Sequence, residues 1–335
     1  MHRLARTPLT RRRVMGAAAL APLLQLPALT AQAQTGARTA SIVVGFPAGG
    51  AADGLARLMS DKLRGVSAPT VVVENRVGAG ARIAIEHVRN APVDGSVMLL
   101  VPDATMFLYP HVYKSLTYDP GRDFTPVTRL IGMSLAMFVG PMVPDSVKTV
   151  ADYVAWVKAD SKRLVYGTPA AGATPHFTGA IFARAAGLDM TPVHYKGGAP
   201  GIQDLAGGQV PVFFGSVADG VALVQAGKVR ALATSGAKRA ALLPDTPTYA
   251  ELGYKDLVVE DGLGMYLPAK TPAVQVQHLN AALQEATKAR DVLDAVRGWG
   301  FEISSESPPE FGARLQRERA RWGPIVKATG FVAIE

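Results

Sequence analysis

The chain contains no cysteine among its 335 residues. A disulfide-stapled fold, a thiolate metal site and a cysteine nucleophile are therefore excluded. The phosphate-binding loop that ends in Gly-Lys-Ser/Thr, the G-x-G-x-x-G turn, the G-x-S-x-G elbow and the His-Glu-x-x-His pair are also missing. The six histidines are not spaced as metal ligands. We expect no metal, no cofactor and no catalytic residue.

Aromatic residues are few, at 7%, and charged residues make up 19% of a chain that is 48% hydrophobic. This is the composition of a globular protein, and the length suits two domains. The net charge of +8 is concentrated at one end, because residues 1–34 hold five arginines and no acid. The remainder has 30 Lys and Arg against 27 Asp and Glu, so we expect no nucleic-acid partner.

Residues 1–33 have the pattern of a removable export signal. A basic segment ending at 11–13 precedes an apolar stretch at 14–29, and Ala-Gln-Ala at 31–33 is a cleavage site for signal peptidase. The paired arginines also resemble a twin-arginine signal, and the general secretory route stays open. The uncharged run at 130–144 is too short to span a bilayer. We expect an exported protein, cut near Ala33, without stable membrane insertion.

Short β-rich runs alternate with helical runs through the rest of the chain. This alternation predicts an α/β protein with mostly parallel sheets flanked by helices. The expected strands are residues 41–46, 70–74, 96–101, 164–167, 191–195, 210–215 and 230–235. The expected helices are residues 52–64, 79–89, 175–186, 199–206, 217–225, 272–288, 291–299 and 308–328.

Two extended apolar runs, residues 125–139 and 257–267, are candidate crossings between two α/β units. A chain that crosses twice makes a hinge with a cleft, and ligands of open α/β sheets bind outside the carboxyl ends of the strands. We therefore expect two lobes. The first comprises residues 34–130 and 262–335, and the second comprises residues 131–261.

The loop after the first expected strand is a candidate anion site. It contains Phe46, Pro47, Ala48, Gly49 and Gly50, and a helix follows. Glycine lets the backbone turn tightly and approach a ligand, and the N–H groups at a helix start favour an anion. Asp53, in the first turn of that helix, is either a cap or an acceptor for the polar end of a ligand.

A second loop repeats this pattern of strand, small residues and helix start. Its candidate residues are Gly167, Thr168, Ala171, Gly172, Ala173 and His176, with Thr174 as the expected N-cap. Neither loop contains Lys or Arg, so an anion would be held by N–H and hydroxyl groups. That suits a small carboxylate better than a triphosphate. Loops after other strands add Asp103, Tyr195, Gly215 and Ser216 as candidates.

These stretches, taken in order, resemble the Bug family of periplasmic solute-binding proteins, the receptors of tripartite tricarboxylate transporters. The similar segments are residues 46–53, 73–80, 166–176, 195–198, 205–210, 227–233, 247–254 and 268–272. The resemblance implies a two-lobed flytrap fold, monomeric and periplasmic, that binds a small organic carboxylate and delivers it to the membrane components of the transporter. It further implies that the carboxylate is held by the backbone from Pro47 to Gly50 and by Gly167, Thr168, Gly172 and Ala173.

Three residues depart from the family pattern. Ala173 stands where many relatives have Ser, and His194 stands where Pro is usual. Gly262 stands where Trp is common, which would enlarge the pocket. The ligand therefore stays open among dicarboxylates, amino acids and aromatic acids.

Two other functions stay open from the sequence. One is an exported serine hydrolase with Ser216 or Ser235 as nucleophile and His176 or His194 as base, which needs a Ser–His hydrogen bond. The other is a periplasmic sensor whose liganded form contacts a membrane receptor.

Overall fold

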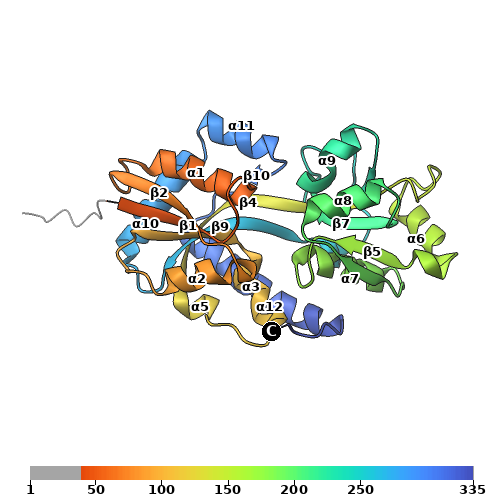
Figure 1. Ribbon diagram of the computed structural model, residues 1–335, viewed down its shortest axis with the longest axis horizontal. Coiled ribbons are helices and arrows are strands. Elements are labelled where there is room, and N and C mark those ends of the chain that lie inside the picture. Colours follow the sequence, from red (N-terminus) through yellow and green to blue (C-terminus); the bar gives the residue numbers. More distant parts are fainter. Residues whose placement is uncertain (1–38, 335) are drawn as a thin grey trace, which may run out of the picture. The chain divides into compact units, whose positions relative to one another are not determined.

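The computed structural model describes residues 39–334, which form a ten-stranded mixed sheet with flanking helices (Figure 1). Hydrogen bonds order the strands β2-β1-β3-β9-β4-β7-β5-β6, and β8 and β10 also pair with β4. The strands are β1 (Thr39–Val44), β2 (Thr70–Asn75), β3 (Val97–Pro102), β4 (Phe124–Val139), β5 (Val165–Thr168), β6 (Thr191–His194), β7 (Val212–Ser216), β8 (Arg230–Thr234), β9 (Glu260–Pro268) and β10 (Glu302–Ile303).

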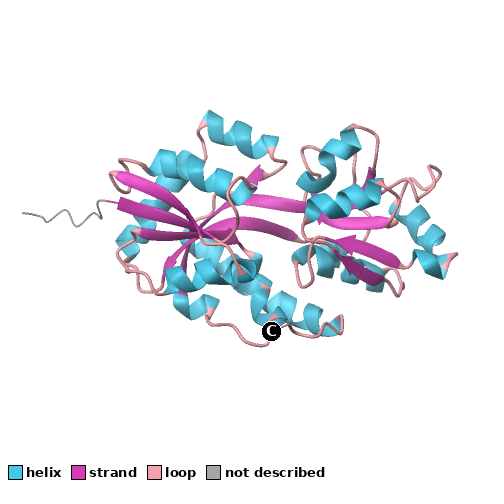
Figure 2. Cartoon of the chain, viewed as in Figure 1, coloured by secondary structure: helices cyan, strands magenta, loops and turns pink. Residues whose placement is uncertain are grey.

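Helices lie on both faces of the strands (Figure 2). They are α1 (Ala51–Leu63), α2 (Arg82–Arg89), α3 (Ala104–Phe107), α4 (Tyr109–Val112), α5 (Pro120–Asp123), α6 (Val150–Lys158), α7 (Thr174–Ala185), α8 (Gly198–Ala206), α9 (Val217–Gln225), α10 (Ala273–Ala286), α11 (Arg290–Gly298) and α12 (Pro308–Ala328). Three 3-10 turns are Ala79–Ala81, Ser161–Arg163 and Lys255–Leu257.

The long strand β4 connects two parts of this ten-stranded sheet. From Phe124 to Ser134 it pairs antiparallel with β9, and from Leu135 to Val139 it pairs antiparallel with β7. We call β1, β2, β3, β9, β10 and the first part of β4 the first sheet, and β5 to β8 with the last part of β4 the second sheet. The strands β1 to β3 are mutually parallel, as are β5 to β7. The predicted α/β class is therefore confirmed. Every pair that involves β4 or β9 is antiparallel, however, so the strands are mixed and not mostly parallel as expected.

Each sheet has its own hydrophobic core. Ile42, Leu100 and Met265 are among the buried residues of the first, and Tyr166 and Phe214 are among those of the second. The β-rich runs of the sequence supply these residues, because strands covered on both faces are apolar at nearly every position.

A separate cluster joins elements of the two sheets. Phe107, Leu135, Phe177 and Trp322 come from α3, β4, α7 and α12, and all four are at least 97% buried. Truncating a fully buried Trp to Ala costs about 3–5 kcal/mol in typical cores. Through Trp322, α12 therefore packs in one apolar cluster with elements of both sheets.

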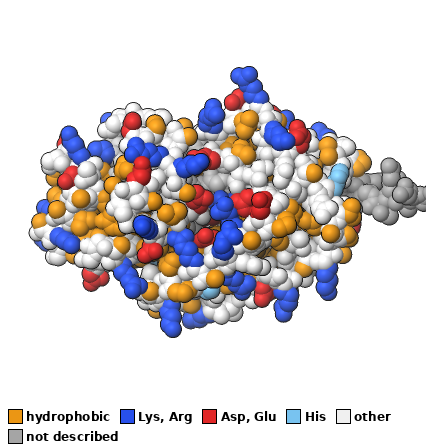
Figure 3. All heavy atoms as spheres, turned by 180° about the vertical axis from the view of Figure 1, so that it is seen from behind, with side chains coloured by type: hydrophobic (Ala, Val, Ile, Leu, Met, Phe, Trp, Pro, Cys, Tyr) orange, Lys and Arg blue, Asp and Glu red, His pale blue; other side chains and the backbone are white. Residues whose placement is uncertain are grey.

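The molecular surface mixes charges of both signs. On the face seen in Figure 3, Lys and Arg side chains are interspersed with Asp and Glu side chains, and apolar side chains lie between them. This distribution agrees with the nearly balanced charge of residues 35–335, where 30 cationic residues meet 27 acids.

The sequence predicts most strands and eight helices to within three residues, but it does not predict α3, α4, α5 or α6. The start of α2 also differs from the prediction. The expected helix at 79–89 begins only at Arg82, because Ala79, Gly80 and Ala81 have left-handed φ angles of 48°, 64° and 73°. A Cβ on Gly45 would overlap the Ala81 side chain, so this turn packs closely on the end of β1. Tertiary packing overrides the local helical preference here.

Candidate functional site

The carboxyl ends of the parallel strands in both sheets point toward one junction. In the first sheet, Pro102 at the end of β3 pairs with Leu263, which in turn pairs with Ile131 of β4. In the second sheet, Ser216 at the end of β7 pairs with Leu135, only four residues farther along β4. The loops that follow β1, β3, β5, β6 and β7 therefore lie at the strand ends nearest to the point where β4 passes from one sheet to the other, and α1 and α7 both start near the middle of the fold in Figure 1.

The carboxylate of Asp53 fixes the conformation of the first loop, residues 46–50. The Gly49 N–H donates to Asp53 Oδ2 at 2.9 Å, and the Arg57 guanidinium contacts both carboxylate oxygens at 2.9 and 3.0 Å. Asn75 Nδ2 donates to Asp53 Oδ1 at 3.0 Å and to the Phe46 carbonyl at 3.1 Å. The Arg57 hydrogen bond lowers the pKa of Asp53 to about 2, although burial opposes this effect.

Four donors thus occupy the four lone-pair positions of the Asp53 carboxylate. A ligand would have to displace one of them to bond to Asp53, so this side chain positions the loop. The residues Pro47, Ala48, Gly49 and Gly50 are exposed. They precede the first turn of α1, whose N–H groups have no partner within the helix.

The second loop is held in a similar way by His176. The Gly172 N–H donates to His176 Nδ1 at 3.1 Å, and the imidazole is only 7% exposed. Burial, together with the nearby ring of His194, lowers the pKa of His176 to about 4. The ring is therefore neutral at pH 7, and its Nδ1 acts as an acceptor.

The helix α7 begins one residue earlier than expected. Ala173 is the N-cap, Thr174 is the first helical residue, and the Thr174 hydroxyl donates to Asp261 Oδ2 at 3.0 Å. The prediction of Thr174 as N-cap is thus wrong, because its hydroxyl is used by a residue of β9. Ala170 and Ala171 are exposed at the tip of the loop.

Several predicted residues are buried supports of these loops. A Cβ on Gly167 would lie 2.8 Å from Phe213, and a Cβ on Gly172 would lie 2.6 Å from Val112 Cγ1. Thr168 is fully buried, and its hydroxyl has no hydrogen-bond partner within the described residues. It is therefore a buried polar group whose hydroxyl the described residues do not satisfy.

The remaining predicted residues lie at the ends of other strands. The Tyr195 N–H donates to the Thr168 carbonyl at 2.9 Å, which fixes the loop after β6 beside the second loop. A Cβ on Gly215 would overlap the ring of Phe213, so Gly215 serves packing. Ser216 is half-buried and caps α9, accepting the Asp219 N–H at 3.3 Å.

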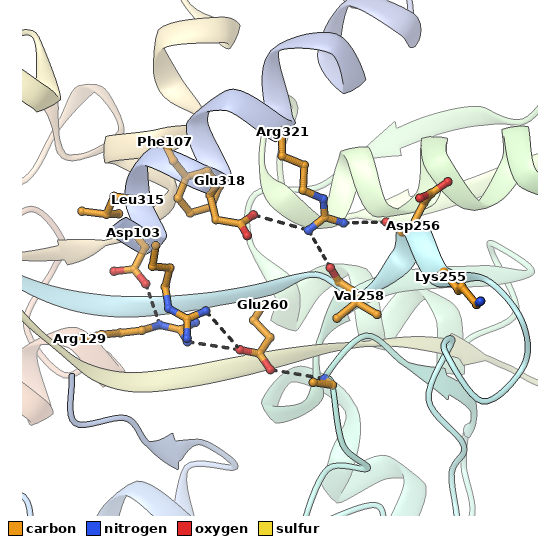
Figure 4. A pocket seen from close by; sticks show the side chains of 12 residues that line it. Asp103, Phe107, Arg129, Lys255, Asp256, Val258, Glu260, Leu315, Glu318 and Arg321 are labelled. Atoms are coloured by element: carbon orange, nitrogen blue, oxygen red, sulfur yellow. Dashed lines mark hydrogen bonds and ion pairs between the residues drawn. The ribbon is translucent and has the colours of Figure 1, made fainter. Parts of the chain in front are cut away.

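Asp103 lies beneath the junction, in a charged network that sequence reasoning missed. Arg129 of β4 donates from Nε to Asp103 at 2.9 Å and from a terminal nitrogen to Glu260 at 3.3 Å (Figure 4). Burial raises the pKa of Asp103 to about 7, while the charge of Arg129 opposes this rise. A cavity of about 460 Å³ adjoins this network and is lined also by Arg314 and Glu318 of α12. The sequence held one indication of this network, because the acidic pair at 260–261 interrupts an otherwise apolar crossing strand.

Gly262 does not enlarge a pocket as expected. A Cβ placed on it would overlap Arg129 Nε and the Ile131 carbonyl, and it would lie 2.7 Å from Asp103. The space beside Gly262 is therefore filled by the buried Arg129–Asp103 pair.

The two serines proposed for hydrolysis have structural partners. The Ser235 hydroxyl donates to the Val259 carbonyl and accepts the Leu135 N–H at 2.9 Å, which pins the two crossing segments together. Ser216 caps α9, and His176 Nδ1 accepts from the Gly172 backbone. Neither serine is arranged as an activated nucleophile.

The profile of a family described as the tripartite tricarboxylate transporter family receptor matches residues 55–331. The chain belongs to this family. It is similar to an R. palustris protein solved with adipate, at 30% identity and a TM-score of 0.77, covering 89% of this chain and 99% of that one. It is similar to the periplasmic binding protein BugD, at 28% identity and a TM-score of 0.73, covering 89% and 99%.

MatC from Rhodopseudomonas palustris, solved with bound malate, is also similar, at 27% identity and a TM-score of 0.72, covering 86% of this chain and 99% of that one. As a member of the tripartite tricarboxylate transporter receptors, the chain is a solute-binding protein and not an enzyme. Between residues 39 and 334, no helix is both long and apolar enough to cross a membrane. The expected export signal, residues 1–33, lies outside the described residues.

Proposed function

We propose that this receptor binds a small organic carboxylate between its lobes and delivers it to the membrane components of a tripartite transporter. The observation that carries the proposal is the pair of small-residue loops before α1 and α7. Both loops follow parallel strands that end at the same junction. Asp53 fixes the conformation of the first loop through the Gly49 N–H, and His176 fixes that of the second loop through the Gly172 N–H.

The chemistry of the loops suits a carboxylate. Neither loop contains a cationic side chain, so backbone N–H groups at the two helix starts supply the attraction for an anion. Two relatives were solved with adipate and with malate, which are both dicarboxylates. The contacts that we propose are the backbone of Pro47 to Gly50, the exposed tip at Ala170 and Ala171, and the Thr168 hydroxyl.

We further propose that the receptor acts as a periplasmic monomer after removal of residues 1–33. The proposed lobe boundaries, 130/131 and 261/262, fall within β4 and β9, the two strands that cross the junction. Closure follows when a ligand contacts both lobes in the closed state and one in the open state.

Titration calorimetry of the refolded, ligand-free protein against adipate, malate, citrate, aspartate and a monocarboxylate tests the proposal. We expect saturable binding of at least one of them, and mass spectrometry of the ligand released by denaturation identifies the physiological class. Gly49→Val should abolish this binding, whereas Gly298→Ala, at the end of α11 with open space around it, should not. Absence of binding to every carboxylate by the ligand-free protein would overturn the proposal.

A further inference from the structure

The carboxylate of Asp261 connects elements of both sheets. Its Oδ2 accepts the Thr174 hydroxyl at 3.0 Å, and Thr174 is the first residue of α7. Asp261 lies on β9 and pairs there with Met133 of β4. A single hydrogen bond therefore joins a strand of the first sheet to the start of the helix that follows β5 in the second sheet.

Hydrogen bonds from Arg129 and Asp103 fix the position of β9 around Asp261. Arg129 donates to the Asp261 carbonyl, and the Asp103 N–H donates to the Gly262 carbonyl at 2.9 Å. The Gly262 N–H donates to Asp261 Oδ1 at 2.8 Å, which fixes the orientation of the carboxylate. Burial raises the pKa of Asp261, whereas the bonds from Gly262 and Thr174 lower it. The Asp261 side chain is thus held between the Gly262 N–H and the Thr174 hydroxyl.

The neighbouring acid, Glu260, has side-chain contacts that differ from those of Asp261. Its carboxylate accepts from Arg129 at 3.3 Å and lies 3.9 Å from Arg314 of α12, and it lines the cavity in Figure 4. Successive side chains of a strand point to opposite faces. Glu260 is therefore a matched control for Asp261, because it is an acid on the same strand with no bond to Thr174.

We propose that Asp261 is a positioning residue for ligand binding, which ties the start of α7 to β9 beside Asp103 and so holds the second loop against the first lobe. The packing of Gly172 against Val112 of α4 places the same loop on the same lobe. The inference rests on the proposed function, because the position of this loop matters to binding only if the loop holds the ligand.

Hydrogen exchange measured by mass spectrometry tests the tie without any ligand. Asp261→Ala and Thr174→Val should both speed exchange in segment 168–176. Thr174→Ser, which keeps the hydroxyl, should exchange as wild type does, and so should Glu260→Gln. Unchanged exchange in Asp261→Ala and Thr174→Val would overturn the inference, as would equal loosening of this segment in Glu260→Gln.

Calorimetry with adipate and malate then separates the two proposals. We expect Thr174→Val to weaken binding about tenfold and Thr174→Ser to restore it, because one hydrogen bond to the buried Asp261 side chain is lost and regained. If neither acid binds wild type but exchange behaves as expected, the positioning role stands and the carboxylate proposal loses support. If both bind wild type and Thr174→Val alike, the positioning role is wrong.

Discussion

The ring of His176 meets the ring of His194 edge to face, with 4.7 Å between their centroids. His176 lies in the first turn of α7, and His194 lies at the end of β6 beside Thr168. Burial disfavours protonation of His176, and the neighbouring imidazole of His194 adds to this effect. The Gly172 N–H therefore finds a neutral acceptor near pH 7.

This pair predicts a loss of stability in mild acid. The pKa of His176 is about 4 in the folded protein against an ordinary 6.5, so the unfolded chain takes up the proton first. The free energy of unfolding should be constant above pH 7 and fall as the pH drops from about 6.5 toward about 4. Urea unfolding at pH 7.5 and pH 5 should show that His176→Gln removes about 1–2 kcal/mol of this fall. His278→Gln, at an exposed position, is the control, and an unaltered pH dependence in His176→Gln would contradict the prediction.

Asp53→Asn should loosen the first loop. The carboxylate accepts from Gly49, Arg57 and Asn75, and an amide cannot accept from all of them. We expect a loss of about 1–2 kcal/mol in the free energy of unfolding at pH 7, discounted for the exposure of Arg57.

The pH dependence of this loss follows from the lowered pKa of Asp53. Its stabilisation is complete above its ordinary pKa of 3.8 and disappears as the pH falls through about 2. The difference between wild type and Asp53→Asn should therefore shrink by about half at pH 3. Chemical denaturation at both pH values checks this, and a difference that is the same at pH 3 and pH 7 would exclude the ion pair as its cause.

The two loop glycines should behave differently when replaced. Gly49 has a φ of +87° and open space within 4 Å of where a Cβ would lie, so Gly49→Val should weaken adipate or malate binding at least about 100-fold with a modest loss of thermal stability. Gly172 has a φ of +71° and lies against Val112, so Gly172→Val should lower stability and binding together. Calorimetry and thermal unfolding distinguish the two. Binding within threefold of wild type in Gly49→Val would refute the assignment of the first loop.

Gly262→Ala should destabilise the junction. A methyl group there would overlap Arg129 Nε and the Ile131 carbonyl, and neither backbone nor buried ion pair can move freely. We expect a loss of about 1–3 kcal/mol in urea unfolding. Gly298→Ala has open space and should be neutral or slightly stabilising. If the two variants were equally stable, the Arg129–Asp103 ion pair would have to move aside for the methyl group, which would contradict the prediction.

The sequence predicted most of the strands, the longer helices except α6, and the two loops, because each depends on a local pattern. An apolar run followed by glycines and a helix start is visible without any tertiary information, as at Phe46–Gly50. The neighbours of Gly172 could not be found in this way, because Val112 and Phe331 come from distant parts of the chain. The same is true of Gly262, where an absent side chain suggested space that Arg129 in fact fills.

The strand β9 lies between β3 and β4, although β3 and β4 are close in sequence and β9 comes much later. The first sheet therefore cannot be completed until most of the chain has been synthesised. The strands β5 to β8 of the second sheet, in contrast, come from one continuous stretch of the chain. Closing such a long-range pairing is slow compared with local pairing. The second sheet should thus assemble before the first. A chain truncated before β9 would leave the facing edges of β3 and β4 unpaired and open to aggregation.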